Sequence, residues 1–243
     1  PDQRNHGDAP RSGRMDYTAM AEDTRAFMAH LGLGRACLLG HSMGGKTAMQ
    51  VASMFPEAVE KLVIVDIAAR GYPPVHAEAI EALAQLDLAA VSCLRDADAR
   101  LAPLIPDPAL RRFLLKSLTH TGGGAYRWRV NLEALRKNYR SLCAPLQLRP
   151  WGGPCLFIRG ARSDYIRDAD WAPTRSLFPQ ARLVDCLLEI DQSLLDRPVG
   201  GHRDPEHPPR VHRCDRQRHQ GGMLAHRPHR HADLNSQVFD LPD

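Results

Sequence analysis

The stretch Arg35-Ala-Cys-Leu-Leu-Gly40-His41-Ser42-Met43-Gly44-Gly45-Lys46-Thr47 decides the fold of this chain. It begins as a short apolar run, breaks into glycines and continues into a pattern typical of a helix. A buried strand, a sharp turn and a helix in this order are the repeating unit of α/β proteins. We therefore expect an α/β fold in which Ser42 lies at the turn between the strand and the helix.

Two motifs overlap at this turn. Gly40 to Gly44 fits G-x-S-x-G, in which small residues on both sides of the serine allow a tight turn that lifts its hydroxyl clear of the sheet. On this interpretation Ser42 attacks a carbonyl carbon, and Lys46 is a solvated residue in the first turn of the helix. Gly40 to Thr47 also fits G-x-x-x-x-G-K-[ST], the P-loop that cradles phosphates, and a strand followed by a helix suits both motifs.

The next strand bears on this choice. Leu62-Val-Ile-Val-Asp66 predicts either a neighbouring strand of an α/β sheet or the strand whose terminal Asp holds Mg²⁺ in a P-loop protein. Only one helix fits between Lys46 and Asp66, whereas a P-loop protein usually places more chain between these two elements. The spacing therefore favours the nucleophilic serine.

Three segments carry a family resemblance, namely residues 2–7 (Asp-Gln-Arg-Asn-His-Gly), 40–46 (Gly-His-Ser-Met-Gly-Gly-Lys) and 65–68 (Val-Asp-Ile-Ala). Their order and separations resemble those of small bacterial-type serine esterases of the α/β-hydrolase superfamily, as far as about Asp185. The resemblance implies an α/β-hydrolase fold, which is a mostly parallel sheet flanked by helices with a helical lid insertion.

The expected organisation follows from this fold. Residues 1–71 and 151–186 are expected to form the two parts of the core, and residues 72–150 the helical lid, with helices around Leu83, Leu110 and Leu132. Residues 187–243 form a polar tail rich in His, Arg and Pro, which is expected to be disordered. Compared with the family, we expect the fold to be incomplete at both ends, without the His-Gly-rich oxyanion loop and without the catalytic His loop after Val184.

The resemblance also implies site residues. Ser42 would form an acyl-enzyme, the backbone N–H of Met43 would hold the oxyanion, and either Asp164 or Asp66 would orient a histidine. The nearest glycine-flanked substitute for that histidine is His202. The expected substrate is a small acyl ester or thioester, and no metal or organic cofactor is expected. Two alternatives stay open, an inactive hydrolase fragment and the P-loop protein.

Local patterns add further expectations. Asp16 is expected to cap a helix that Gly32 ends, with an apolar face listed as Met20, Thr24, Phe27, Met28 and Leu31. Pro56 is expected to stop the helix after the Ser42 turn. The segment Gly153–Ile158 predicts a later strand, and Ala181–Val184 the start of one more.

The composition limits the kinds of partner and location that we expect for the protein. The net charge of +4 is spread along the chain without a basic stripe interleaved with aromatics, so no nucleic-acid partner is expected. No apolar run approaches the roughly 20 residues of a membrane span, and a cytoplasmic location is expected by default. The six cysteines lack C-x-x-C spacing and are expected to be free thiols.

The tail after Arg197 permits two further hypotheses. His226, His229 and His231 with Cys214 supply possible metal-ligand types, although their spacing matches no usual zinc pattern. A shifted reading frame of a GC-rich coding sequence would also produce such a composition, and the nucleotide sequence would test this.

Overall fold

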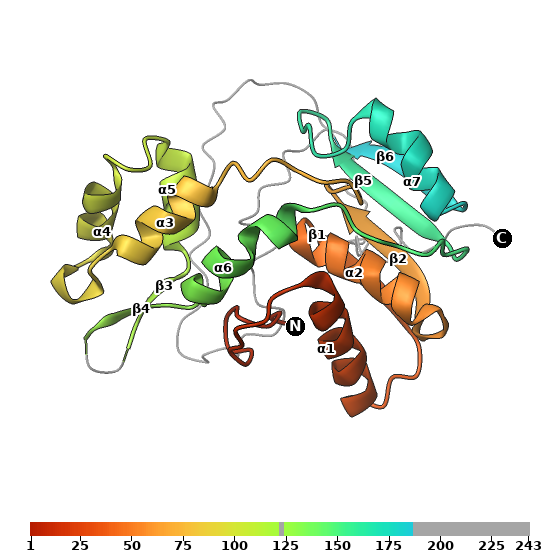
Figure 1. Cartoon of the computed structure of the whole chain (residues 1–243), viewed down its shortest axis with the longest axis horizontal. Helices are drawn as coiled ribbons and strands as arrows, with labels where there is room; N and C mark the ends of the chain where they lie inside the picture. The colour runs from red at the N-terminus through yellow and green to blue at the C-terminus, as the bar shows by residue number, and fades with distance from the viewer. Residues whose placement is uncertain (122–123, 187–243) are drawn as a thin grey trace, which may run out of the picture. The chain divides into compact units, whose positions relative to one another are not determined.

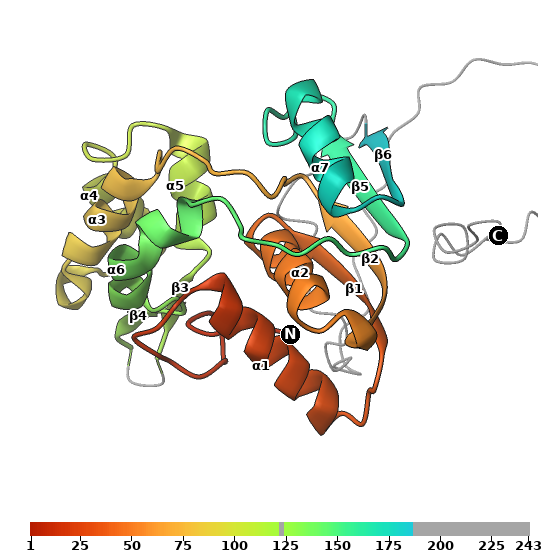
Figure 2. The same ribbon diagram turned by 45° about the vertical axis from the view of Figure 1, so that its right-hand side comes forward.

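The computed structural model describes residues 1–121 and 124–186 (Figures 1 and 2). Its sheet has four strands in the order β1-β2-β5-β6, all parallel to their neighbours. The strands are β1 (Ala36–His41), β2 (Val59–Val65), β5 (Cys155–Gly160) and β6 (Ala181–Cys186). The predicted parallel sheet and its four predicted strands are confirmed.

The register aligns the carboxyl ends of the strands that matter for the site. His41 pairs with Val65, and Val65 pairs with Ile158. The backbone N–H of Ser42 donates to the Val65 carbonyl at 3.1 Å, and that of Asp66 donates to the Ile158 carbonyl at 2.8 Å. The residues that directly follow β1, β2 and β5 therefore meet at one edge of the sheet.

Helix α2 (Met43–Met54) covers β1 and β2. Its buried residues Ala48, Val51 and Ala52 belong to the central apolar cluster together with strand residues such as Ile64. The helix ends before Pro56, as predicted, and Pro56–Ala58 form a single 3-10 turn (η1). This packing fixes the start of α2, and with it the Ser42 turn, against the sheet.

On the same face of the sheet as α2, β5 packs against α7 (Trp171–Leu177), which follows the short 3-10 turn η3 (Asp168–Asp170). The Phe157 ring lies 5.9 Å from the Trp171 ring and 5.8 Å from the Phe178 ring, between centroids. Such aromatic pairs add to the burial of apolar area. They hold the loop after β5, which borders the site.

Helix α1 (Tyr17–His30) begins as predicted, because the Asp16 side chain accepts from the Ala19 N–H at 2.7 Å. Gly32 follows the helix with a φ of +71°, a conformation that suits glycine. The predicted apolar face is partly wrong, since Phe27 and Leu31 are 42% and 53% exposed. Helix α1 packs on α2 rather than directly on a strand, so its core contacts come from a different set, listed as Tyr17, Ala19, Met20, Ala21 and Met28.

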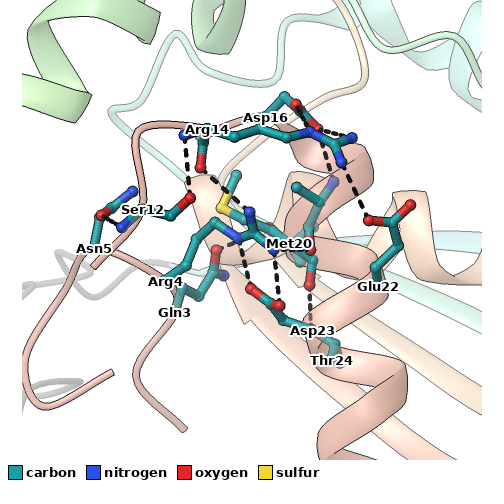
Figure 3. A network of polar contacts seen from close by, with 12 residues as sticks. Gln3, Arg4, Asn5, Ser12, Arg14, Asp16, Met20, Glu22, Asp23 and Thr24 are labelled. Atoms are coloured by element: carbon teal, nitrogen blue, oxygen red, sulfur yellow. Dashed lines mark hydrogen bonds and ion pairs between the residues drawn. The ribbon is translucent and has the colours of Figure 1, made fainter. Parts of the chain in front are cut away.

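The first residues are held against α1 and α2 by polar contacts. Figure 3 shows Arg4 donating two hydrogen bonds to the Asp23 carboxylate, at 2.6 and 2.8 Å, from the loop to the helix. The Thr47 hydroxyl donates to Gln3 Oε1 at 3.0 Å. The N-terminal segment is thereby fixed beside the first turns of α2.

Between β2 and β5 the chain forms a separate group of elements, here called the insertion (residues 72–150). Its elements are α3 (Ala77–Gln85), η2 (Leu88–Ala90), α4 (Leu94–Leu101), α5 (Pro108–Leu115), β3 (Leu118–His120), β4 (Tyr126–Trp128) and α6 (Leu132–Cys143). These elements share an apolar cluster of their own, which includes Leu83, Leu101 and Trp128. The helices around Leu83, Leu110 and Leu132 were predicted, whereas α4 and the β3–β4 hairpin were not.

The two chain segments that lead into and out of the insertion run side by side. The Tyr72 N–H donates to the Cys143 carbonyl at 2.8 Å, and the Leu146 N–H donates to the Ala69 carbonyl at 2.9 Å. We call this paired region the neck. Within the described residues, no helix is both long and apolar enough to cross a membrane.

Candidate active site

Ser42 occupies a strained turn between β1 and α2. Its φ and ψ are 49° and −116°, so a residue with a side chain holds a positive φ. The side chain makes no capping hydrogen bond to the helix that it precedes. Strain of this kind persists only where the surrounding structure imposes it, and it concentrates at functional sites.

Two glycines make this turn possible. A Cβ on Gly40 would overlap the Gly44 carbonyl group, and a Cβ on Gly45 would lie 2.6 Å from Ile67 Cγ2. The chain therefore crosses itself closely at Gly40 and packs directly on the sheet at Gly45. Gly44 is different, because its nearest neighbour would be Gln3 Nε2 at an ordinary 3.5 Å.

A cavity of about 550 Å³ lies beside Ser42. Met43 and Lys46 line it from α2, while Val75, Leu135 and other residues line it from the insertion. The lining is mainly apolar, and its charged residues are Lys46, Arg70, Arg162 and Asp164. A cavity of this size and lining suits the apolar body of a small organic substrate.

Met43 is the first residue of α2, so its backbone N–H has no partner within the helix. The N-terminus of a helix carries a partial positive charge that favours an anion. Met43 also lines the cavity beside Ser42. The start of α2 therefore places this N–H beside Ser42 and the cavity.

The two candidate acids occupy different positions. Asp66 follows β2 with a φ of +52°, and its carboxylate accepts from Ser163 Oγ at 2.7 Å and from the Gly160 N–H at 3.2 Å. Asp164 lines the cavity, but its side chain is exposed and its contact with Arg70 is made by its backbone carbonyl, at 3.0 Å. Asp66 is thus held in place by neighbouring groups, and Asp164 lies closer to the cavity space.

Lys46 is buried, and the expectation that it is solvated is wrong. It is 1% exposed, its ammonium donates to the Ala144 carbonyl at 3.0 Å, and it faces the rings of Tyr17 and Tyr72, with centroids at 5.5 and 4.9 Å. Burial lowers the pKa of Lys46 to about 8. The helix presents this residue to α1 and to the neck instead of to water.

These contacts do not fit the P-loop alternative. A P-loop lysine reaches toward phosphates and the following Ser or Thr holds Mg²⁺. Here Lys46 is engaged by the neck, and the Thr47 hydroxyl bonds to the Met43 carbonyl and to Gln3, both at 3.0 Å. The sequence Gly40–Thr47 therefore matches the P-loop pattern, but its side chains do not make the contacts of a P-loop.

The predicted base His202 and the possible metal ligands Cys214, His226, His229 and His231 lie outside the described residues. Within the described part of the chain, His76 lines the cavity together with Ser42. The sequence analysis missed His76, Tyr72 and Arg70 because they flank the start of the insertion, where no motif marks them. Their proximity to Ser42 depends on the neck.

Comparisons with known proteins agree with this geometry. A family model described as "alpha/beta hydrolase fold" matches residues 1–106. The chain is 38% identical over 189 residues to the mouse (Mus musculus) protein named sn-1-specific diacylglycerol lipase ABHD11, covering 75% of this chain and 61% of that protein. It is 31% identical to the Escherichia coli protein named esterase YbfF, covering 74% of this chain and 70% of that protein.

Two further matches extend over a larger share of the related protein. An abhydrolase domain-containing protein of Schizosaccharomyces pombe is 33% identical, and the match covers 76% of this chain and 72% of that protein. A solved structure titled "Marine microorganism esterase" superposes with a TM-score of 0.72 at 36% identity, covering 76% of this chain and 74% of that chain. The chain therefore spans about three fifths of the ABHD11 relative and nearly three quarters of these two proteins.

Proposed function

The chain belongs to the α/β-hydrolase family, as the resemblance predicted, and we propose that it is a serine hydrolase that cleaves carboxylic ester or thioester bonds. One observation carries this proposal. Ser42 is held at a positive φ on the wall of a mainly apolar cavity, next to the first N–H of α2. A serine in this setting is positioned for attack on an acyl carbon.

The chemistry follows from these positions. Ser42 Oγ attacks the carbonyl carbon while a base removes its proton, and the carbonyl oxygen becomes an oxyanion that the Met43 N–H stabilises. Collapse of this intermediate expels the alcohol or thiol and leaves an acyl group on Ser42. Water then attacks the acyl-enzyme, which releases the carboxylic acid and restores the hydroxyl.

Asp66 is the acid that the contacts favour for orienting the catalytic histidine. Strands β1 and β2 are paired neighbours, so Asp66 and Ser42 follow adjacent strand ends. The two donors on the Asp66 carboxylate fix its orientation, and a carboxylate retains further lone pairs for a histidine N–H. Asp164, at the exposed rim, is the alternative acid.

The general base is a histidine, and two residues are candidates for it. His202 is the glycine-flanked histidine beyond the last strand, and His76 is supported by its place on the cavity wall. Substitution of each by Ala in separate variants distinguishes them, because loss of the base lowers the reactivity of Ser42, whereas loss of a surface histidine does not.

The insertion (residues 72–150) acts in this proposal as a lid that supplies the apolar wall. Val75, Leu135 and Leu142 come from its two ends and line the cavity opposite α2. Esters with a small apolar acyl group fit such a wall. The names of the relatives, esterase and diacylglycerol lipase, agree with an ester substrate.

A fluorophosphonate probe tests the proposal, since it reacts with serines that are activated as nucleophiles. The 243-residue chain should be labelled at one residue, and Ser42→Ala should abolish the label. Ser176→Ala is the matched control, because Ser176 is an exposed helix residue whose hydroxyl donates to the Ala172 carbonyl within α7. A folded protein that takes up no label, or one whose label survives Ser42→Ala, would refute the proposal.

A further inference from the structure

Lys46 places a positive charge at the wall of the Ser42 cavity. It lies in the first turn of α2, where its backbone N–H donates to the Ser42 carbonyl at 3.1 Å. The residue is 1% exposed and lines the cavity, so solvent or a ligand reaches its small accessible surface from the cavity side. Its one hydrogen-bond acceptor in the described structure is the Ala144 carbonyl.

No carboxylate of the described residues forms an ion pair with this ammonium. The neighbours that act on its charge are Cys143 and the guanidinium of Arg70, after the dominant effect of burial. Burial is the largest cause that lowers the pKa of Lys46, Arg70 lowers it further, and Cys143 acts in the opposite direction.

Arg70 does not supply a carboxylate partner for Lys46 through its own ion pair. Its guanidinium contacts Asp170 at 3.0 Å, but the same carboxylate also pairs with Arg167, at 3.0 Å. Two guanidinium groups thus share one carboxylate beside the neck. Asp164 also lines the cavity but forms no ion pair with Lys46, so among the described residues the Lys46 ammonium has no carboxylate partner.

A buried charge without a counter-ion is unfavourable, and proteins usually pair it or replace it by an apolar residue. The aromatic faces of Tyr17 and Tyr72 compensate in part through cation–π contacts. An anionic group on a bound ligand would supply the missing counter-charge. Arg70 and Arg162 also line the cavity, but Lys46 is the cationic residue that follows Ser42 on the same helix, so we expect such a group to bind chiefly there.

We propose that Lys46 is a specificity-determining residue that binds a carboxylate carried on the acyl group of the substrate. This inference rests on the proposed ester hydrolysis at Ser42. The acyl group stays attached to Ser42 in the acyl-enzyme, so its far end is the part of the substrate that extends along the cavity wall beside α2. The preferred substrates are then half-esters or half-thioesters of short dicarboxylic acids.

The kinetic test uses two esters of equal length, monomethyl glutarate and the neutral amide of the same half-ester. The wild-type chain should prefer the carboxylate by about tenfold or more in kcat/KM, mainly through a lower KM. Lys46→Met, which keeps the length of the side chain and removes the charge, should abolish the preference while hydrolysis of the amide changes little. Lys46→Arg should retain part of the preference.

Lys137→Met is the matched control, because Lys137 is an exposed lysine of α6 that pairs with Glu133. This variant should keep the wild-type preference. An equal loss on both esters in Lys46→Met, with circular dichroism unchanged, would show a merely structural role and overturn the proposal.

A second pair of esters distinguishes the two sides of the substrate. Carboxymethyl butyrate carries its carboxylate on the alcohol, and ethyl butyrate is its neutral counterpart. Lys46→Met should change their ratio little. A change here that is larger than the change with the glutarate pair would place the anion on the leaving group and overturn the acyl assignment.

Binding can be measured without turnover. The side-chain ¹³C signal of Lys46, assigned by its absence from Lys46→Met, reports the titration of the amine. Glutarate should raise the pKa of Lys46 in both the wild-type chain and Ser42→Ala, and the neutral diamide should not. A shift without ester hydrolysis would reject the proposed function alone, whereas hydrolysis of neutral esters without a shift would reject the role of Lys46 alone.

Discussion

Ser42 and Asp66 are the residues that directly follow two paired parallel strands, and both hold a positive φ, 49° and 52°. Each therefore turns the chain away from the sheet at the same edge, one toward α2 and the other toward the neck. Non-glycine residues adopt this conformation rarely, and here two neighbours adopt it side by side. The pair brings a hydroxyl and a carboxylate to one end of the sheet.

The turn at Ser42 predicts different tolerances for two nearby glycines. Gly40→Ala should lower the free energy of unfolding by about 2 kcal/mol or more, because its Cβ would overlap the Gly44 carbonyl group. Gly44→Ala should change stability by no more than about 1 kcal/mol, since the added Cβ meets Gln3 at an ordinary distance and alanine favours a helix. Urea unfolding of the two variants measures the difference, and equal losses would contradict the close crossing at Gly40.

The two candidate acids should differ in their effect on catalysis. Asp66→Asn keeps the shape of the side chain but removes its charge, and kcat should fall by about 10²- to 10⁴-fold, as expected for the acid that orients a catalytic histidine. Asp164→Asn should change kcat by less than about tenfold, because no donor in residues 1–121 and 124–186 holds this exposed carboxylate in place. Steady-state kinetics with a neutral ester measures both, and the reverse order would assign the role to Asp164.

Lys46 should give the protein a characteristic dependence of stability on pH. Its pKa in the folded state is about 8, below the usual value of about 10.4 in an unfolded chain. Between these values the unfolded chain binds more protons at this residue, so its contribution makes the fold more stable as the pH rises. Below about pH 8 both states are charged, and burial of the charge is fully destabilising.

The difference between the wild-type chain and Lys46→Met isolates this effect. The thiol of Cys155, whose pKa burial raises to about 12, contributes the opposite slope but is present in both proteins. Relative to the variant, the wild-type chain should gain at most about 1.4 kcal/mol per pH unit between pH 8 and 10. Lys137→Met should show no such slope, and a flat difference for Lys46→Met would contradict a buried ammonium.

The cysteines should react according to their burial. Cys155 is 4% exposed within β5, and burial raises its pKa to about 12, so little thiolate forms near neutral pH. Cys37 and Cys93 are exposed free thiols. Iodoacetamide at pH 7.5 should therefore modify Cys37 and Cys93 in the native protein and leave Cys155 unmodified until urea is added, as mass spectrometry would show.

Local signals in the sequence were sufficient where a single segment determines its own structure. The glycines around Ser42 require one particular turn, and Asp16 caps α1 with its own side chain. The hairpin of β3 and β4 was missed because each strand has three residues, too few to show an alternating pattern. Helix α4 was missed because half of its residues are charged and its cap is Cys93.

Tertiary contacts decide what the sequence could not show. Lys46 has a polar side chain on an ordinary helix, and its burial depends on Tyr17, Tyr72 and Ala144, which come from three other parts of the chain. Phe27 and Leu31 follow the helical period but extend past the partner that would cover them. The order of strands at the sheet edge likewise determines that Asp66 lies beside the Ser42 strand.

The neck between the sheet and the insertion has a consequence for how such proteins diversify. Two backbone hydrogen bonds clamp the entering and leaving segments together, and the insertion has an apolar cluster of its own. Changes of length or sequence inside it need not propagate into the strands. Exchanging residues 74–142 between relatives should thus be a practical route to altered substrate preference, with the clamp acting as the joint at which the exchanged module is attached.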